Sequence, residues 1–154
     1  MNIFLVGPMG AGKTTIGKLL AKKLNKPFLD ADQELERQTG VNIPWIFDVE
    51  GEAGFRYREA AIIDTLTQEK DIVLATGGGA VLKKQNRQAL KNRGKVIYLS
   101  VDVKTQIGRT EKGHQRPLLQ IDNVKKKLEE LYNIRHPIYM EIADYHVATN
   151  KYTI

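Results

Sequence analysis

Short apolar segments alternate with longer amphipathic segments along this chain. Five apolar runs, each bounded by glycine, proline or charge, lie at 2–7, 27–31, 71–79, 95–100 and 145–149. Their length and composition predict β-strands. The segments between them have helical periodicity; in 13–25, the residues expected to form one apolar stripe are Ile16, Leu19, Leu20 and Leu24. Strands that alternate with helices predict a three-layer α/β fold, with a parallel sheet covered on both faces.

The bulk composition limits the class of protein. With 154 residues, the chain is expected to form one compact domain over 1–154. The formal charge of +6 and the pI near 9.5 favour anionic partners such as nucleotides, small acids or nucleic acid. The absence of cysteine excludes disulfides and suits a reducing cytosol. No apolar run has the length of a membrane span, and the first is not a signal peptide, so we predict a cytoplasmic protein without membrane contact.

The strongest motif is the segment 7–15, which reads GPMGAGKTT. It contains the full pattern G-x-x-x-x-G-K-[ST] and lies between a predicted strand and a predicted helix, as this motif requires. Its backbone N–H groups and the helix N-terminus would bind oligophosphate, Lys13 would contact the β- and γ-phosphates, and the Thr14 hydroxyl would bind Mg²⁺. The residues of this loop that we expect to bind ATP are Gly10, Ala11, Gly12, Lys13, Thr14 and Thr15.

A phosphate-binding loop alone does not decide the fate of the nucleotide. No guanine-reading N/T-K-x-D motif follows the fourth predicted strand, and the third ends in LATGGG rather than the Asp-Glu pair of many motor ATPases. The acids of the site are therefore expected at Asp30 and Asp32, in the segment FLDADQ. Residues i and i+2 of an extended strand point to the same side, so we expect both carboxylates to face one spot at the strand's end.

Two features predict a small acidic molecule as the phosphate acceptor. Arg56 and Glu59 stand three residues apart on one face of a predicted helix, with Phe55 beside them. The glycines at 77–79 end the third strand, where the missing side chains let backbone amides approach a ligand closely.

Two more arginines lie in the second half of the chain. Arg116 belongs to the polar, basic segment 109–117, which predicts a mobile lid at about 110–121 or else a solvated surface connection. Arg135 lies in the helical segment that follows, and this helix is expected to break near Pro137. Together with a phosphate-binding loop, these arginines favour an anionic acceptor.

In order and spacing, several segments resemble the shikimate kinase family. They are GPMGAGKTTIGKLLA, LDAD, GEAGFRYRE, TGGGAV, RPLL and RHPIY, and the resemblance extends from residue 2 to about residue 150. Gluconate kinases and adenylate kinases share the framework but lack this set. The resemblance implies a P-loop kinase resembling the nucleoside monophosphate kinases, with a five-stranded parallel sheet. It implies transfer of the ATP γ-phosphate to the 3-hydroxyl of shikimate, on the pathway to chorismate and the aromatic amino acids.

The resemblance also implies roles on the nucleotide side. Asp30 would lie near Mg²⁺, through water, and would share the ion with Thr14. Arg109 would lie against the adenine ring, and Arg116 would move in with the lid and offset charge on the transferred phosphoryl group. The catalytic residues implied in this way are Lys13, Asp32 and Arg116, with Mg²⁺ as cofactor.

On the acceptor side, the resemblance implies a helical region at about 31–61. Asp32 would hydrogen-bond the reacting hydroxyl, and Arg56 and Arg135 would bind the carboxylate, which a planar guanidinium suits better than an ammonium. The shikimate-binding residues implied are Asp32, Arg56, Gly78, Gly79, Arg135, Phe47 and Phe55. Trp45 is expected in a small satellite core. The family also has a helix beyond the last strand, whereas this sequence stops at ATNKYTI.

Other functions stay open at this point. A related kinase could act on another small hydroxy acid such as gluconate, and a nucleotide-binding module could bind without transfer. A nucleic-acid binder would need basic and aromatic residues along one face, whereas the arginines here belong to a predicted pocket. The histidines that lack metal spacing, and so receive no role, are His114, His136 and His146. We expect a monomer with ATP and shikimate as partners and no nucleic acid.

Overall fold

The computed structural model describes residues 1–110 and 118–150. Its elements in chain order are β1 (Ile3–Val6), α1 (Lys13–Leu24), β2 (Phe28–Asp30), α2 (Ala31–Thr39), α3 (Ile43–Leu66), β3 (Val73–Ala75), the 3₁₀ helix η1 (Ala80–Leu82), α4 (Lys84–Arg93), β4 (Lys95–Ser100), α5 (Val103–Thr110), α6 (Leu118–Ile142) and β5 (Tyr145–Ala148). Each predicted strand is confirmed. Arg116 and most of the predicted lid at about 110–121 lie outside the described residues.

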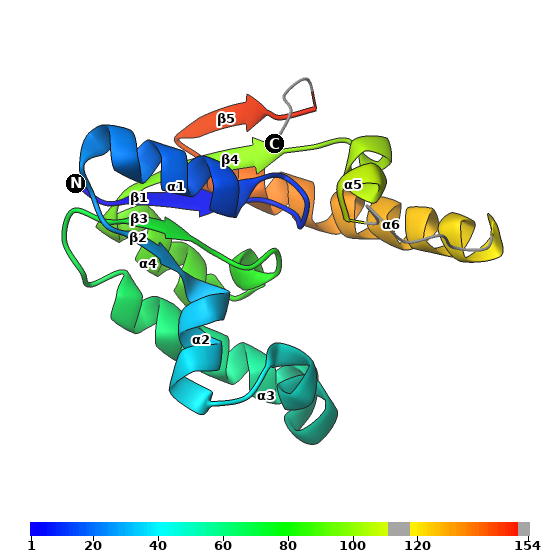
Figure 1. Ribbon diagram of the computed structural model, residues 1–154, viewed down its shortest axis with the longest axis horizontal. Helices are drawn as coiled ribbons and strands as arrows, with labels where there is room; N and C mark the ends of the chain where they lie inside the picture. The colour runs from blue at the N-terminus through cyan, green and yellow to red at the C-terminus, as the bar shows by residue number, and fades with distance from the viewer. Residues whose placement is uncertain (111–117, 151–154) are drawn as a thin grey trace.

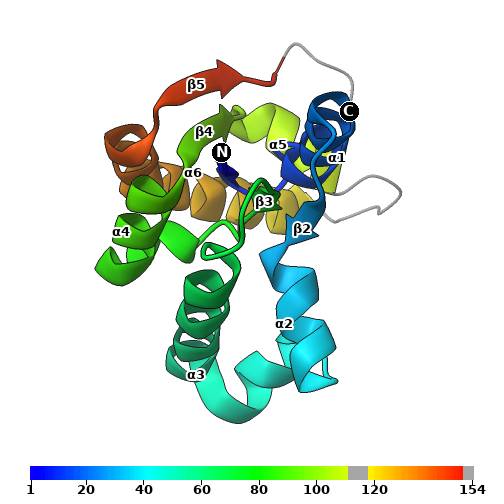
Figure 2. The ribbon, with the colours of Figure 1, turned by 90° about the vertical axis from the view of Figure 1, so that its left-hand side faces the viewer.

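The strands form one parallel sheet in the order β2-β3-β1-β4-β5 (Figure 1). Helix α1 lies on one face, whereas α4, α6 and the second half of α3 lie on the other (Figures 1 and 2). Alternate residues of β1 serve both faces: Phe4 and Val6 join the larger core with α3, α4 and α6, and Leu5 joins a smaller core with Ala21 of α1. The predicted three-layer α/β fold is confirmed.

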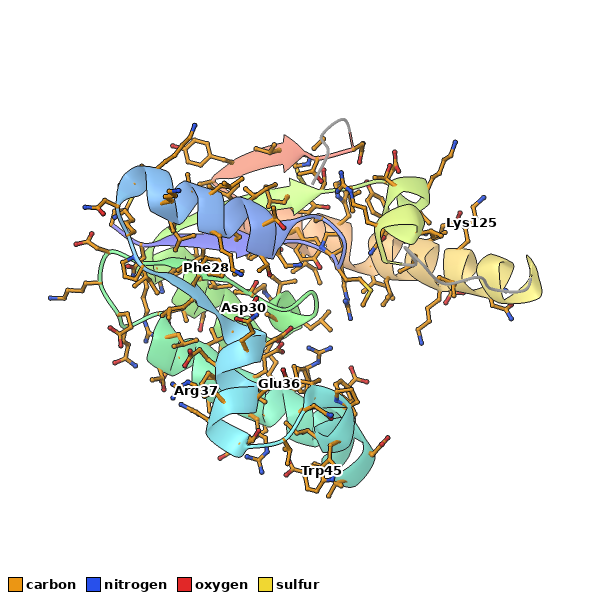
Figure 3. The ribbon with its side chains drawn as sticks, in the orientation of Figure 1. Phe28, Asp30, Glu36, Arg37, Trp45 and Lys125 are labelled. Carbon is orange, nitrogen blue, oxygen red and sulfur yellow. The ribbon has the colours of Figure 1, made fainter. Side chains whose placement is uncertain are left out.

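The predicted apolar stripe of α1 is confirmed at Ile16, which packs against the smaller core, but is wrong at Leu19 and Leu24. Leu19 and Leu24 are 60% and 44% exposed, and the buried residues of this helix are Gly17 and Ala21. A methyl group added at Gly17 would lie only 2.4 Å from a ring carbon of Phe28, the β2 residue labelled in Figure 3. The helix therefore approaches the sheet closely at its small residues, Gly17 and Ala21.

The region 31–61 projects from the sheet as α2 and the first part of α3 (Figure 2). Asn42 caps α3 by accepting the N–H of Trp45 at 2.9 Å, and Gly51 interrupts the helix with φ 74°. The predicted burial of Trp45 in a satellite core is wrong. Its side chain is 48% exposed and points away from the sheet (Figure 3), because the neighbouring Ile46 occupies the buried face of this helix.

Helix α6 does not break near Pro137, contrary to expectation, and continues to Ile142. A proline inside a helix removes one backbone hydrogen bond, a loss that tertiary packing can offset. Here the last turns carry Tyr139 and Ile142, both buried against the sheet in the larger core. In the described part of the chain, no helix is both long enough and apolar enough to cross a membrane.

Candidate active site

A cavity of about 730 Å³ opens at the carboxyl ends of the strands, where parallel sheets bind ligands. The loop after β1, the start of α2, the start of α3, the glycines after β3 and the inner face of α6 enclose it. The predicted site residues that line it are Gly10, Gly12, Lys13, Thr14, Thr15, Asp30, Asp32, Phe47, Phe55, Arg56, Gly78, Gly79 and Arg135. Ala11 is fully buried beneath the loop, and Arg109 lies outside the lining.

The loop of residues 7–15 adopts the conformation that its glycines permit. Gly12 has φ 93° and precedes α1 without any side-chain cap, so the first N–H groups of the helix stay open to a ligand. Lys13 donates from Nζ to the carbonyl oxygens of Gly7 and Pro8, the latter at 2.9 Å. Burial lowers the pKa of Lys13 to about 8, although the nearby aspartates oppose this shift. A desolvated ammonium thus lies at the centre of the loop.

The two aspartates do not share a strand, so the geometric reason given for their pairing is wrong. Asp30 ends β2 (Figure 3), and its Oδ1 caps α2 by accepting the N–H groups of Asp32 at 3.0 Å and Gln33 at 3.1 Å. Its Oδ2 accepts from the Thr14 hydroxyl at 3.0 Å. Asp32 lies in the first turn of α2. Asp30 is the N-cap of this helix, a position that favours aspartate, so the strand ends before Asp32. The two carboxylates therefore point to different places, and that of Asp30 faces the phosphate-binding loop.

Asp32 faces the glycine turn after β3. A methyl group at Gly77 would lie 2.9 Å from a carboxylate oxygen of Asp32 and 3.1 Å from one of Glu59. Burial raises the pKa of Asp32, and Asp30 adds to this, whereas Lys13 opposes it. Burial likewise raises the pKa of Glu59, which is 2% exposed. Two desolvated carboxyl groups therefore lie close to the backbone of Gly77, which has no side chain.

Arg56 is held between an acid and an aromatic ring. Its Nη1 donates to Glu59 at 2.9 Å, as their spacing predicts, and its guanidinium carbon lies 5.2 Å from the centre of the Phe55 ring. Phe47 stacks on Phe55 with ring centres 4.7 Å apart. A methyl group at Gly79 would lie 2.3 Å from Arg56 Nη2, so the guanidinium fits directly against this glycine.

Arg135 approaches the same glycine turn from α6. A methyl group at Gly78 would lie 3.4 Å from Arg135 Nη1. One turn later, Tyr139 donates its hydroxyl to the Gly78 carbonyl, and burial raises the pKa of Tyr139 to about 12 while Arg135 opposes this. Arg135 Nε is buried and has no hydrogen-bond partner in the part of the chain described here.

Sequence reasoning missed Tyr139 and a group of apolar residues in the wall. The cavity residues of α6 that it missed are Val124, Lys127, Leu128, Leu131, Tyr132 and Tyr139. Most of these residues lie three or four positions from one another and from Arg135, so they share one face of the helix. This spacing could have identified the cavity wall from the sequence. Tyr98 lines the cavity from the carboxyl half of β4, so its position in the predicted strand was the available signal.

Helix α5 supports the phosphate-binding loop from behind. Arg109 donates to the Gly10 carbonyl at 3.0 Å and to the Thr149 carbonyl at 2.6 Å. Gln106 donates to the Met9 carbonyl at 2.8 Å. These bonds fix the outer side of the loop, and the contact of Arg109 with adenine stays a prediction.

The residues predicted for Mg²⁺ fit that ion. The Thr14 hydroxyl and the Asp30 carboxylate lie 3.0 Å apart, and both are the oxygen donors that Mg²⁺ prefers. Within residues 1–110 and 118–150, no group of three or more His, Cys, Asp and Glu side chains could hold a metal ion. Phosphate oxygens and water would therefore have to complete its shell, as is usual for Mg²⁺ bound with a nucleotide.

Comparison with known proteins identifies the family. A sequence model described as shikimate kinase matches residues 9–154. The chain belongs to the shikimate kinase family. A shikimate kinase of Methylococcus capsulatus is 57% identical over 152 residues, which cover 99% of this chain and 85% of that protein. The resemblance drawn from the sequence motifs is confirmed, and the chain is an ATP-dependent kinase of this family.

Solved structures of other shikimate kinases have the same fold. The enzyme of Acinetobacter baumannii in complex with shikimate aligns with a TM-score of 0.91 and 54% identity, covering 98% of this chain and 84% of that one. That of Bacteroides thetaiotaomicron aligns with a TM-score of 0.87 and 35% identity, covering 96% and 86%. The predicted P-loop kinase fold with a five-stranded parallel sheet is therefore confirmed.

Proposed function

We propose that this member of the shikimate kinase family transfers the γ-phosphate of ATP to the 3-hydroxyl of shikimate, giving shikimate 3-phosphate and ADP. One observation supports the proposal: Arg56, Arg135 and Asp32 converge on the glycine turn, and Lys13 of the phosphate-binding loop lines the same cavity. The charges of both Lys13 and Arg56 thus act on a single carboxylate, Asp32.

On the acceptor side, Arg56 and Arg135 bind the shikimate carboxylate. Planar guanidinium groups match a carboxylate with paired hydrogen bonds, and Glu59 holds Arg56 in place at 2.9 Å. The stacked rings of Phe47 and Phe55 form an apolar wall for the carbon ring of the acceptor. The backbone of Gly78 and Gly79 lies open between the arginines and completes the acceptor site.

Asp32 orients the reacting hydroxyl and takes its proton. The acceptor oxygen forms a bond to the γ-phosphorus, the bond from that phosphorus to the ADP oxygen breaks, and the hydroxyl proton passes to the Asp32 carboxylate. Burial raises the pKa of Asp32 and makes it a better proton acceptor than an exposed aspartate. Lys13 opposes this shift and favours the ionised form that the step requires.

On the donor side, Lys13 exchanges its bonds to the carbonyls of Gly7 and Pro8 for the β- and γ-phosphates. The open N-terminus of α1 adds N–H donors to the same phosphates. Thr14 and Asp30 would hold Mg²⁺, which neutralises charge on the phosphate oxygens when bound. Arg109 at the adenine and Arg116 at the transferred phosphoryl group complete the proposed set.

The test is coupled ADP release from the intact chain with and without shikimate, with gluconate as the alternative acceptor. ADP release that depends on shikimate and is lost in Lys13→Ala supports the proposal. Arg56→Ala is expected to raise KM for shikimate about 10- to 100-fold with KM for ATP nearly unchanged, because a bond to a charged group is lost.

The matched control is Arg58→Ala. Arg58 lies two residues along the same helix and pairs with Glu50 outside the cavity, so its loss is expected to leave both KM values unchanged. Turnover of gluconate but not shikimate, or ADP release indifferent to any acceptor, would overturn the proposal. The monomeric state, the cytoplasmic location and the absence of a nucleic-acid partner stay predictions.

A further inference from the structure

Arg135 lies on a turn of α6 whose backbone hydrogen bonding is incomplete. Pro137 lies inside this helix and lacks an N–H group, so the carbonyl of Asn133 has no helical hydrogen bond from it. The proline ring also crowds that carbonyl, and such a site kinks a helix unless other contacts fix it. Tertiary contacts on the same turn must therefore set the direction in which Arg135 projects.

The contacts that hold this turn centre on Tyr98 of β4, a residue only 1% exposed. His136 Nδ1 lies 2.7 Å from the Tyr98 hydroxyl, and the Tyr139 ring lies 4.7 Å from that of Tyr98. His136 also stacks on Tyr132, one turn earlier, at 4.7 Å and 16°. On the side of β5, His146 stacks on Tyr98 at 4.7 Å and 12°. Of these contacts, the hydrogen bond between Tyr98 and His136 and the ring contact between Tyr98 and Tyr139 join α6 to the sheet.

The hydrogen bond joins a protonated phenol to a neutral imidazole ring. Burial raises the pKa of Tyr98, so its hydroxyl keeps its proton and can donate. Burial and the nearby His146 lower the pKa of His136, so its ring is neutral near pH 7. With its ring proton on Nε2, neutral His136 accepts this hydrogen bond at Nδ1.

We infer that His136 is a positioning residue for the acceptor site. By accepting the Tyr98 hydrogen bond, it fixes the turn of α6 that carries Arg135 toward the glycine turn. The same turn carries Tyr139, whose hydroxyl bonds the Gly78 carbonyl, so both the arginine and the glycine backbone depend on it. This inference rests on the proposed function and adds to it a residue that does not itself line the cavity.

The test is a double-mutant cycle with His136→Phe and Tyr98→Phe, followed by steady-state kinetics with both substrates. His136→Phe keeps a ring on Tyr132 but loses the acceptor, and Tyr98→Phe loses only the donor. Each is expected to raise KM for shikimate about 3- to 10-fold, the effect of one hydrogen bond, with kcat and KM for ATP within about twofold. The double variant is expected to match the single ones, because both remove the same bond.

Rescue and controls separate positioning from general damage. His136→Asn places an amide oxygen near the position of Nδ1, so it is expected to restore KM for shikimate. Ile134→Ala, at a 59% exposed position on the same turn, is expected to leave it unchanged. Effects that multiply in the double variant, failure of the Asn rescue, or a loss confined to kcat would overturn the inference. A wild-type chain that does not turn over shikimate would instead refute the proposed function.

Discussion

Gly79→Ala tests whether Arg56 must lie against the glycine turn. The added methyl group would lie 2.3 Å from Nη2, 2.5 Å from Nη1 and 2.6 Å from Cζ of Arg56. Gly79 has φ −94°, which alanine adopts without strain, so the backbone itself accepts the change. The clash falls on the end of a flexible side chain, and the variant is expected to fold.

The magnitude follows from how far the guanidinium must move. A normal carbon–nitrogen contact is about 3.5 Å, so the group has to shift by roughly 1 Å. Such a shift strains its 2.9 Å bond to Glu59 and misdirects the fork that faces the acceptor. One bond to a charged group contributes about 1.5–3 kcal/mol, so KM for shikimate is expected to rise about 10- to 100-fold.

Steady-state kinetics with each substrate varied in turn provides the measurement, with Gly108→Ala as the matched control. Gly108 lies in α5, and a methyl group there meets no atom within 4 Å. The control should keep both KM values and gain up to about 1 kcal/mol of stability from helix propensity. An unchanged KM for shikimate in a folded Gly79→Ala protein, or a rise in KM for ATP instead, would refute the reasoning.

Three further predictions concern packing, backbone support and pH. Gly17→Ala is expected to reduce the free energy of unfolding by about 1–3 kcal/mol in urea titration, because its methyl group would overlap Phe28. Tyr139→Phe should raise KM for shikimate about 2- to 10-fold through the lost bond to Gly78, measured beside KM for ATP as control. The lowered pKa of His136 means that the unfolded chain binds this proton more readily, so stability should fall as pH falls below 6.5. Urea titrations at about pH 7.5 and about pH 5.5 should show a larger loss for wild type than for His136→Asn, and equal losses would contradict the assignment.

The fold and the phosphate-binding loop could be predicted because their signals are local. Each strand is a short apolar run with its own boundaries, and the loop's function depends on consecutive glycines followed by Lys13 and Thr14. The i, i+3 pair of Arg56 and Glu59 was predictable for the same reason, since helical spacing alone brings them together.

Errors arose where a distant element decides which residues are buried. The stripe on α1 failed at Leu19 and Leu24 because this helix contacts the sheet through Gly17, beside Phe28 of β2, and no pattern within α1 records that neighbour. The expected break at Pro137 failed because Tyr139 and Ile142 pack against the sheet and offset the lost helical bond. Asp30 and Asp32 both line the cavity, but the capping of α2 by Asp30, not strand geometry, sets the directions of the two side chains.

The sequence by itself determined the order of elements and the phosphate-binding loop, because these depend on neighbours within a few positions. Tertiary structure alone decided how the charges face one another. Asp32 and Glu59 meet at Gly77, and Tyr98 reaches His136 across 38 positions of the chain. Such contacts form when packing brings separate elements together. Each is stabilised by a partner that lies far away in the sequence, where no local pattern indicates it.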